Sequence, residues 1–394
     1  MSTSQSQPPR IHPMMPVSDH DELAEQQFVI ALKTFIASEM DPVVRDLTNA
    51  AVAELGVEDS LQSALPDIRR RLEPQQPYQN WVSAMRAAQE LMWQAAGDCV
   101  DHQHSDIDEL ARSAPAIGTV TVDPNFIVPR YLAATDTHMM PGSYHVDPPD
   151  GGVRQGAVFD KAASLYSLGR QGGQMNDMRG QTVIAHVYER FPDLEPARVL
   201  EMGCTVGNSL CAVARAFPQA EVHGLDVGAG LLKYAHARAA RLGVALHFKQ
   251  ASAEDSGYPD NHFDLVFSSA VLHETSAKAL PRIMAECFRV LRPGGVMVHL
   301  EVPFRAAEAD AYSLIRADFE TRYNNEPFWM GAVSADYEAL AREAGFAEIG
   351  AGFQDAAFGP PARGIRGQFG NENKGGYKSW YIASARKPQS KAMA

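Results

Sequence analysis

Short apolar runs alternate with helical patterns along the second half of the chain. From Ala197 onward, stretches rich in Val, Leu and Phe are separated by segments whose apolar residues recur at helical spacing. This alternation is typical of a parallel sheet with helices on both faces. The pattern predicts seven strands, near residues 198–202, 221–226, 245–249, 264–268, 296–302, 347–353 and 378–386.

The first part of the chain has a different pattern. Residues 1–18 are polar and proline-rich, which predicts a disordered tail. Residues 19–123 predict a mostly helical N-terminal domain, in which Phe28, Leu32 and Phe35 recur at helical spacing. This domain contains no motif that we connect with catalysis.

Residues 124–180 are rich in turn-forming and aromatic residues, which predicts a connector or lid. The α/β domain of residues 181–388 follows. It is interrupted by a helical piece at about 307–323 and by a glycine-rich loop at 359–376. We expect both insertions to lie at the substrate end of the sheet.

The most informative segment is residues 198–210, Arg-Val-Leu-Glu-Met-Gly-Cys-Thr-Val-Gly-Asn-Ser-Leu. An apolar run ends at Glu201, and Gly203 and Gly207 follow before a helical pattern opens. Glycines here allow backbone angles and a close ligand approach that a Cβ would prevent. Asp226 ends the next apolar run, where it can accept hydrogen bonds from a ribose diol.

The loop lacks two familiar nucleotide-binding patterns. It does not have the G-x-G-x-x-G spacing of dinucleotide sites, and no Lys-Ser/Thr pair follows it as in a P-loop. A ribose-binding acid without a pyrophosphate cradle favours a nucleoside cofactor that carries no phosphate, and S-adenosylmethionine fits that description.

With these residues in view, the chain resembles the class I S-adenosylmethionine-dependent methyltransferases from about residue 155 to 386. It is most similar to the group that includes the ubiquinone/menaquinone C-methyltransferases and many small-molecule methyltransferases. Besides the glycine loop and Asp226, the matching segments occur in the family's order at residues 159–166, 251–255, 263–274 and 291–295. The resemblance implies a seven-stranded Rossmann-like sheet whose last strand is antiparallel.

The resemblance also implies the cofactor-binding residues. They are Tyr166, Glu201, Gly203, Cys204, Gly207, Asp226, Val227, Ser252, Ala253, Glu254 and Ser268. Two positions depart from the family's pattern. Thr205 stands where a third glycine is common, and a β-branched residue is costly at positive φ, so a different loop shape is open. Ser252 stands where Asp is frequent, which leaves an uncharged acceptor for the adenine amino group.

Three residues are candidates for catalysis. His273 and Glu274 follow the fourth strand, and Glu301 closes the fifth. A histidine can act as a general base near neutral pH. The alternative is that His273 begins a helix and packs beside the cofactor without moving a proton.

Four aromatic or imidazole side chains are candidates for substrate binding. Tyr144 and His145 lie in the connector, and Tyr323 and Trp329 lie in or just after the helical insertion. Their character favours an apolar or aromatic acceptor, although such residues also build ordinary cores.

Composition narrows the functional classes. The formal net charge of −13 argues against nucleic acid as the main partner, and no apolar run is long enough to span a membrane. The four cysteines, at 99, 204, 211 and 287, match no disulfide or zinc spacing, which favours a reduced, cytoplasmic location. His102, His104, Asp101 and Asp106 have side chains that can bind a metal ion. They lie in a strongly polar stretch, so no metal site is expected.

The sequence therefore predicts S-adenosylmethionine-dependent methyl transfer, on carbon or oxygen, to a small acceptor that is apolar or aromatic. Two alternatives stay open: a non-catalytic binding module on the same fold, and a nucleotide-dependent oxidoreductase. A homodimer is compatible with the sequence, which identifies neither the acceptor nor a catalytic base.

Overall fold

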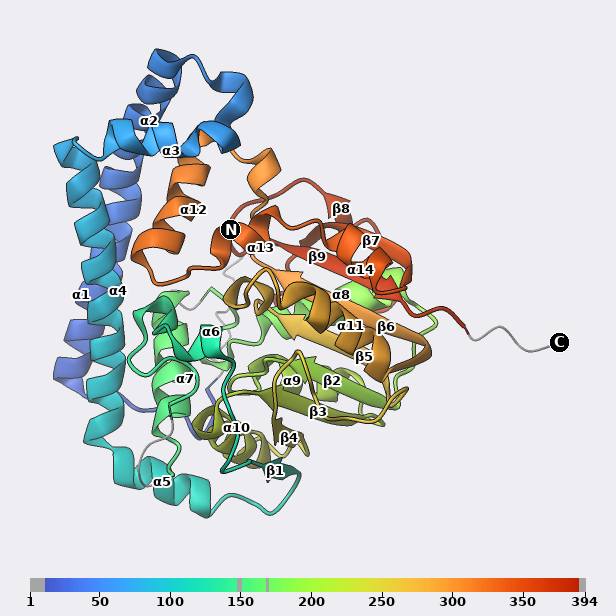
Figure 1. Cartoon of the computed structure of the whole chain (residues 1–394). Helices are drawn as coiled ribbons and strands as arrows, with labels where there is room; N and C mark the ends of the chain where they lie inside the picture. The colour runs from blue at the N-terminus through green and yellow to red at the C-terminus, as the bar shows by residue number, and fades with distance from the viewer. Residues whose placement is uncertain (1–10, 147–150, 168–169, 390–394) are drawn as a thin grey trace, which may run out of the picture.

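The computed structural model describes residues 11–146, 151–167 and 170–389. In Figure 1 a mixed α/β unit lies beside a group of long helices from the N-terminal part of the chain. The helices of that group are α1 (His20–Phe35), α2 (Asp41–Leu55), α3 (Leu61–Leu72), α4 (Gln76–His102) and α5 (His104–Arg112).

One sheet organises the rest of the described chain, with the order β1-β4-β3-β2-β5-β6-β9-β7-β8. Its strands are β1 (Thr119–Thr121), β2 (Arg198–Met202), β3 (Glu221–Asp226), β4 (His247–Gln250), β5 (Phe263–Ser269), β6 (Leu291–Glu301), β7 (Ala347–Asp355), β8 (Phe369–Asn371) and β9 (Ser379–Arg386). Strands β1 to β6 pair in parallel, and β9 lies antiparallel between β6 and β7. The predicted antiparallel last strand is therefore confirmed.

The sheet has nine strands, so the expectation of seven was wrong. The two additional strands, β1 and β8, are three residues each and lie at opposite edges of the sheet. Thr-Val-Thr and Phe-Gly-Asn are too short to show a period, and only pairing with β4 and β7 makes them strands. A local sequence pattern therefore could not predict these two edge strands.

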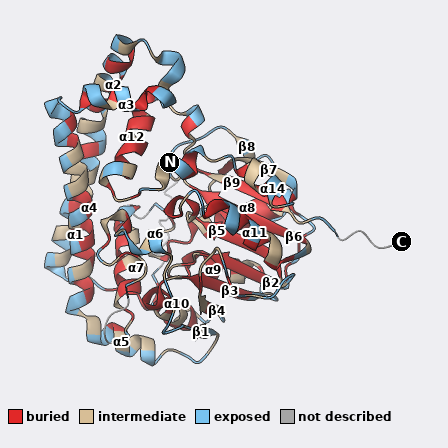
Figure 2. Ribbon diagram, viewed as in Figure 1, coloured by how far each residue is buried: buried red, intermediate tan, exposed pale blue. Residues whose placement is uncertain are grey.

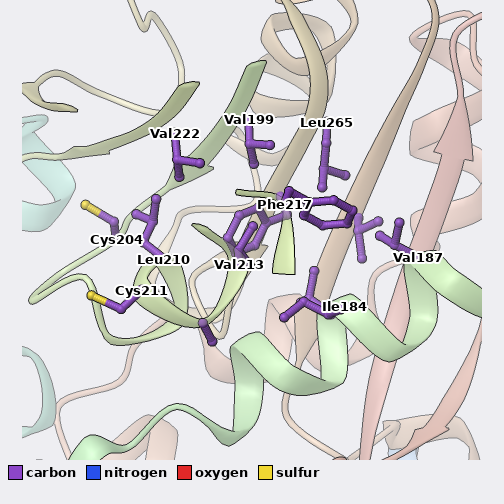
Figure 3. Packing of buried hydrophobic residues seen from close by; sticks show 14 of the residues in the cluster. Ile184, Val187, Val199, Cys204, Leu210, Cys211, Val213, Phe217, Val222 and Leu265 are labelled. Atoms are coloured by element: carbon purple, nitrogen blue, oxygen red, sulfur yellow. The ribbon is translucent and has the colours of Figure 1, made fainter. Parts of the chain in front are cut away.

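Helices cover both faces of the sheet, as the strand–helix alternation predicted. On one face α8 (Met178–Arg190), α9 (Asn208–Ala216) and α10 (Ala229–Arg241) pack on Val199, Leu265 and Val296. Figure 3 shows part of this core, with Ile184 and Val187 of α8 facing strand residues. On the other face α11 (Leu280–Val290) and α14 (Tyr337–Glu343) pack on the alternate residues Leu200, Val266 and Met297.

The N-terminal helices do not have a core of their own. Ile68, Trp81 and other residues of α2 to α4 share a buried cluster with α12 (Ala311–Tyr323) and α13 (Trp329–Ser334) from the insertion after β6. Figure 2 shows the buried sides of these helices turned toward one another. The remaining helices, α6 (Arg130–Ala133) and α7 (Arg154–Tyr166), belong to the connector. Helix α7 packs between α4 and α10, so the connector joins the two parts.

The expectation of a disordered tail is wrong for residues 11–18, while residues 1–10 lie outside the described residues. His12 is buried and forms an ion pair with Asp160 at 2.9 Å. The Tyr234 hydroxyl donates to the Met14 carbonyl at 2.9 Å. A polar, proline-rich composition predicted no order here because these partners lie more than a hundred residues away in the sequence.

Two further expectations concern the cysteines and membrane-spanning segments. All four cysteines are free and buried. Among the described residues, no helix is both long enough and apolar enough to cross a membrane.

Candidate active site

A cavity of about 410 Å³ opens at the carboxyl ends of the central strands. It lies beside β2 and β5, where the strand order reverses and open α/β sheets bind their ligands. One wall comes from the segments that follow β2, β3, β4 and β5, at Gly203, Asp226, Ser252 and Val271. The other walls come from α4, the connector, α7, α8 and the two insertions.

The glycine loop has the left-handed backbone that its sequence predicted. Gly203 has φ +70°, and a Cβ there would lie 2.7 Å from the Val271 side chain. Gly207 has φ +69°, and its Cβ would approach the Phe248 ring to 3.1 Å. Thr205 adopts φ +43°, so the loop keeps its left-handed turn with a strained β-branched residue.

Asp226 holds the loop from the end of the neighbouring strand. Its Oδ2 accepts a hydrogen bond from the Thr205 amide at 2.9 Å, and its Oδ1 accepts one from the Gly228 amide at 3.0 Å. Burial raises the pKa of Asp226 to about 6, although the backbone donors oppose the shift. Asp226 also lines the cavity, so it supports the loop beside the space for a ligand.

Glu201 and Arg179 both line the cavity, and each affects the pKa of the other. Burial raises the pKa of Glu201 to about 8, and the Arg179 guanidinium opposes this shift. Burial also lowers the pKa of Arg179, which the nearby carboxylate of Glu201 resists. Glu201 was a predicted site residue, whereas Arg179 was missed because it lies on α8, outside every motif.

Seven of the predicted cofactor residues line the cavity: Tyr166, Glu201, Gly203, Asp226, Val227, Ser252 and Ala253. Cys204, Gly207, Glu254 and Ser268 are not among the lining residues. The Cys204 amide donates to the Leu225 carbonyl at 3.0 Å, so that donor supports the loop. Gly207 is the N-cap residue before α9, and its missing Cβ leaves room for Phe248.

Glu254 and Ser268 are turned toward other partners. Glu254 accepts a hydrogen bond from the Tyr131 hydroxyl at 2.8 Å and pairs with Arg282. Ser268 lies 2.7 Å from His299, on the α11 side of the sheet, and its neighbour Ser269 lines the cavity instead. Successive strand residues point to opposite faces, so an error of one residue exchanges a site residue for a core residue.

The three predicted catalytic residues lie together at the ends of β5 and β6. His273 Nδ1 lies 2.7 Å from Glu301 Oε2, and Glu301 Oε1 accepts the amides of Val271 and Leu272 at 2.9 and 2.7 Å. Burial lowers the pKa of His273, but the Glu301 and Glu274 carboxylates outweigh it and raise the pKa to about 9. In the ligand-free protein, His273 is therefore protonated at neutral pH. A protonated imidazole cannot accept a proton, which disfavours the general-base interpretation.

No sequence motif pointed to His138, which completes this group from the connector. Its Nε2 lies 2.8 Å from Glu274 Oε1, and its Nδ1 lies 2.8 Å from Glu326 Oε1. The backbone at His138 is left-handed, with φ +56°. Glu326, equally unforeseen, lies between α12 and α13 and is almost fully buried.

The predicted substrate residues divide evenly. Tyr144 and Trp329 line the cavity, and the Tyr144 hydroxyl donates to Glu274 Oε1 at 3.1 Å. His145 and Tyr323 do not line the cavity. Tyr323 packs on Phe319, in the core shared by α12 and the N-terminal helices.

Comparison with known proteins agrees with this geometry. Residues 199–295 match the methyltransferase domain family. The chain is 37% identical over 135 residues to trans-aconitate 2-methyltransferase of Methylobacterium radiotolerans, covering 34% of this chain and 48% of that protein. It is 37% identical over 112 residues to fatty-acid O-methyltransferase of Mycolicibacterium smegmatis, covering 28% of this chain and 38% of that protein.

A third relative is covered more fully. The chain is 28% identical over 212 residues to the ubiquinone/menaquinone biosynthesis C-methyltransferase of Vibrio campbellii, covering 48% of this chain and 78% of that protein. Otherwise the chain spans about half the length of the curated relatives it matches. Residues 199–295, which contain the glycine loop and the strand-end acid, are therefore a methyltransferase domain.

Proposed function

We propose that this chain transfers a methyl group from S-adenosylmethionine to a small apolar or aromatic acceptor. The observation that carries the proposal is a single cavity, which is lined by the glycine loop with Asp226 and also by apolar side chains together with His138, His273 and Glu274. A cofactor and an acceptor in one enclosed space can react without intervening water.

The end of the cavity at the glycine loop fits the polar groups of S-adenosylmethionine. Glu201 Oε2 and Arg179 Nε are buried, and neither has a hydrogen-bond partner among the described residues. A carboxylate and a guanidinium match the ammonium and the carboxylate of a methionine moiety. We expect Asp226 to accept hydrogen bonds from the ribose diol, and Gly203 lines the cavity beside it.

The other end of the cavity supports an apolar or aromatic acceptor. Its lining side chains include Met92, Trp93, Leu132, Phe159, Val302 and Phe304. The similarity to a fatty-acid O-methyltransferase accords with this lining. We infer carbon or oxygen as the accepting atom, because the relatives include both C- and O-methyltransferases.

Methyl transfer places few demands on the protein. When bound, S-adenosylmethionine supplies a methyl group that its sulfonium charge already activates. The chain's residues must hold the acceptor in line with that group and exclude water, which can provide much of the acceleration. Trp329 packs against His273 with ring centroids 5.0 Å apart, and the two side chains close this part of the wall.

Calorimetric titration with S-adenosylhomocysteine tests the cofactor site. Wild-type protein should bind with micromolar affinity, and Asp226→Ala should weaken binding at least about 30-fold, because a charged hydrogen-bond acceptor is lost. Asp255→Ala is the matched control, since Asp255 is exposed and is not among the residues lining the cavity. No binding to wild-type protein would overturn the proposal.

Labelled S-adenosylmethionine then tests turnover with phenols, carboxylic acids and activated methylenes of graded size. Transfer that Asp226→Ala removes and Asp255→Ala retains would support the proposal. Tight cofactor binding without transfer to any acceptor would favour the non-catalytic binding module instead.

A further inference from the structure

Three side chains from distant parts of the sequence converge on one wall of the cavity. His138 comes from the connector, and His273 and Glu274 follow β5. Oε1 of Glu274 lies 2.8 Å from Nε2 of His138 and 3.5 Å from Nε2 of His273. Separations of this size are those of neighbouring ligands around one metal ion, whose bonds to nitrogen and oxygen are about 2.0 to 2.2 Å long.

Each histidine has a carboxylate at its other ring nitrogen. Nδ1 of His138 lies 2.8 Å from Glu326 Oε1, and Nδ1 of His273 lies 2.7 Å from Glu301 Oε2. Metal-bound histidines regularly have such a carboxylate partner, which fixes the tautomer and makes the ligating nitrogen more basic. Both Nε2 atoms lie near Glu274; the His273–Glu301 contact is a hydrogen bond, whereas His138 Nδ1 lies close to Glu326 without hydrogen-bond geometry.

The carboxylates behind the histidines are themselves fixed. The Asn324 amide donates to Glu326 Oε1 at 2.8 Å, and two backbone amides hold Glu301. The backbone of His138 is fixed from helix α4, because Trp93 Nε1 and Gln89 Nε2 donate to its carbonyl at 2.8 and 3.1 Å.

The group also contains buried oxygens that lack hydrogen bonds. Glu274 Oε2 and Glu326 Oε2 have no hydrogen-bond partner among the described residues. The Glu326 side chain is fully buried, and the potential ligand atoms of His138, His273, Glu274 and Glu326 all lie within 4.8 Å of one another. Buried carboxylate oxygens of this kind are costly unless they meet a positive partner.

We propose that His138, His273 and Glu274 bind a divalent first-row transition-metal ion through Nε2, Nε2 and a carboxylate oxygen. Two imidazoles and one carboxylate suit Fe²⁺, Zn²⁺ or Co²⁺, whereas Mg²⁺ and Ca²⁺ prefer oxygen ligands throughout. Glu326 and Glu301 are positioning residues that orient the two imidazoles. This site revises the expectation of no metal, which was based on sequence spacing alone.

All three ligands line the cavity, so the ion's remaining coordination positions face the acceptor space. A bound ion lowers the pKa of a coordinated hydroxyl, which would make an acceptor oxygen a better nucleophile. This role rests on the proposed methyl transfer, whereas binding of the ion does not.

Cobalt binding tests the site without an activity assay. Full-length protein is treated with a chelator and titrated with Co²⁺, followed by calorimetry and by visible absorption. We expect one equivalent to bind with micromolar or tighter affinity. His138→Ala, His273→Ala and Glu274→Gln should each weaken binding at least about 100-fold, and Glu326→Gln about tenfold.

His102→Ala is the matched control. His102 also lies near two carboxylates, those of Asp19 and Glu22, but this second group is largely exposed and remote from the cavity. The control should bind Co²⁺ as wild type does. No binding to wild-type protein, or equal losses in His102→Ala and His138→Ala, would overturn the proposal and leave the cavity group as an ion-pair cluster only.

Titration with S-adenosylhomocysteine separates this proposal from the function. Ligand variants that retain its binding are folded, so their loss of Co²⁺ is specific. If an alanine variant does not fold, Glu326→Gln provides the decisive measurement. Asp226→Ala should lose S-adenosylhomocysteine and keep Co²⁺, so failure of either proposal is visible without the other.

Discussion

The two ends of the cavity are built in different ways. At the cofactor end, the shape comes from backbone: two glycines at positive φ, a loop whose amides bond to Leu225, and Asp226 holding Thr205 and Gly228. At the acceptor end, the shape comes from side chains. His138, His273, Glu274 and Glu326 stand on three separate segments and contact one another directly or through a shared partner.

The difference shows which changes each end can tolerate. A backbone-built site depends on conformation, because its backbone amides and its positive φ angles form the loop. A side-chain-built site depends on the exact identity of a few residues and on the elements that carry them. The N-terminal helices hold His138 through Trp93 and Gln89, so they take part in the acceptor end although they contribute little to the cofactor end.

The strongest test of the backbone-built end is Gly203→Ala. A methyl group there would meet Val271 at 2.7 Å while φ is +70°, so both sterics and backbone oppose it. We expect affinity for S-adenosylhomocysteine to fall at least about 100-fold, which corresponds to about 3 kcal/mol.

The control for this prediction is Gly331→Ala in helix α13, where nothing lies within 4 Å of the added Cβ. It should bind normally and gain up to about 1 kcal/mol of stability, because glycine is unfavourable inside a helix. Calorimetric titration measures both variants. Binding by Gly203→Ala within threefold of wild type would show that side chains rather than backbone shape this end.

The second prediction uses the charge of Glu201, whose pKa burial raises from 4.5 to about 8. The free folded protein holds this proton more tightly than the unfolded chain does. Its stability should therefore fall as pH rises between these two values, while affinity for a ligand ammonium should rise. Between pH 7 and 8 the ionised fraction grows from about one-tenth to one-half, so we expect affinity to increase about fivefold.

Titrations in buffers of different ionisation enthalpy would detect the proton released when S-adenosylhomocysteine binds at pH 7. Glu201→Gln should abolish both the release and the pH dependence over this interval. If the variant keeps the full pH dependence, another group titrates and the pairing of Glu201 with the ammonium is wrong.

The same contrast explains what could be predicted from the sequence. Strands β2 to β7 and β9, the glycine loop and the cavity position of Asp226 were predicted, because each depends on a contiguous pattern. Ser268 was predicted instead of Ser269 because a local pattern predicts where a strand lies better than which face of the sheet each of its side chains points to.

The acceptor end could not be predicted in the same way. His273, Glu274 and Glu301 were found because they follow recognisable strands. His138 and Glu326 share no motif, and nearly two hundred residues separate them in the sequence. Arg179 lies in an ordinary helical pattern. His138 and Glu326 meet only because the connector and the insertion after β6 pack together, and Arg179 lines the cavity from α8.

The smallest expected effect tests whether the N-terminal helices act on the acceptor end alone. Trp93→Phe removes one of two hydrogen bonds to the His138 carbonyl and leaves that of Gln89. One such bond contributes about 1 kcal/mol, so Co²⁺ affinity should fall up to about fivefold while S-adenosylhomocysteine affinity stays within twofold of wild type. Trp81→Phe is the control, since the Trp81 Nε1 donates to Asp41 at 2.8 Å, in the helical core outside the cavity.

The two variants lose similar hydrogen bonds from the same helix, so a general loss of stability should affect both alike. A selective loss of Co²⁺ affinity in Trp93→Phe would therefore mean that α4 positions His138. Equal effects would mean that it does not, and the two ends would then differ less than their geometry indicates.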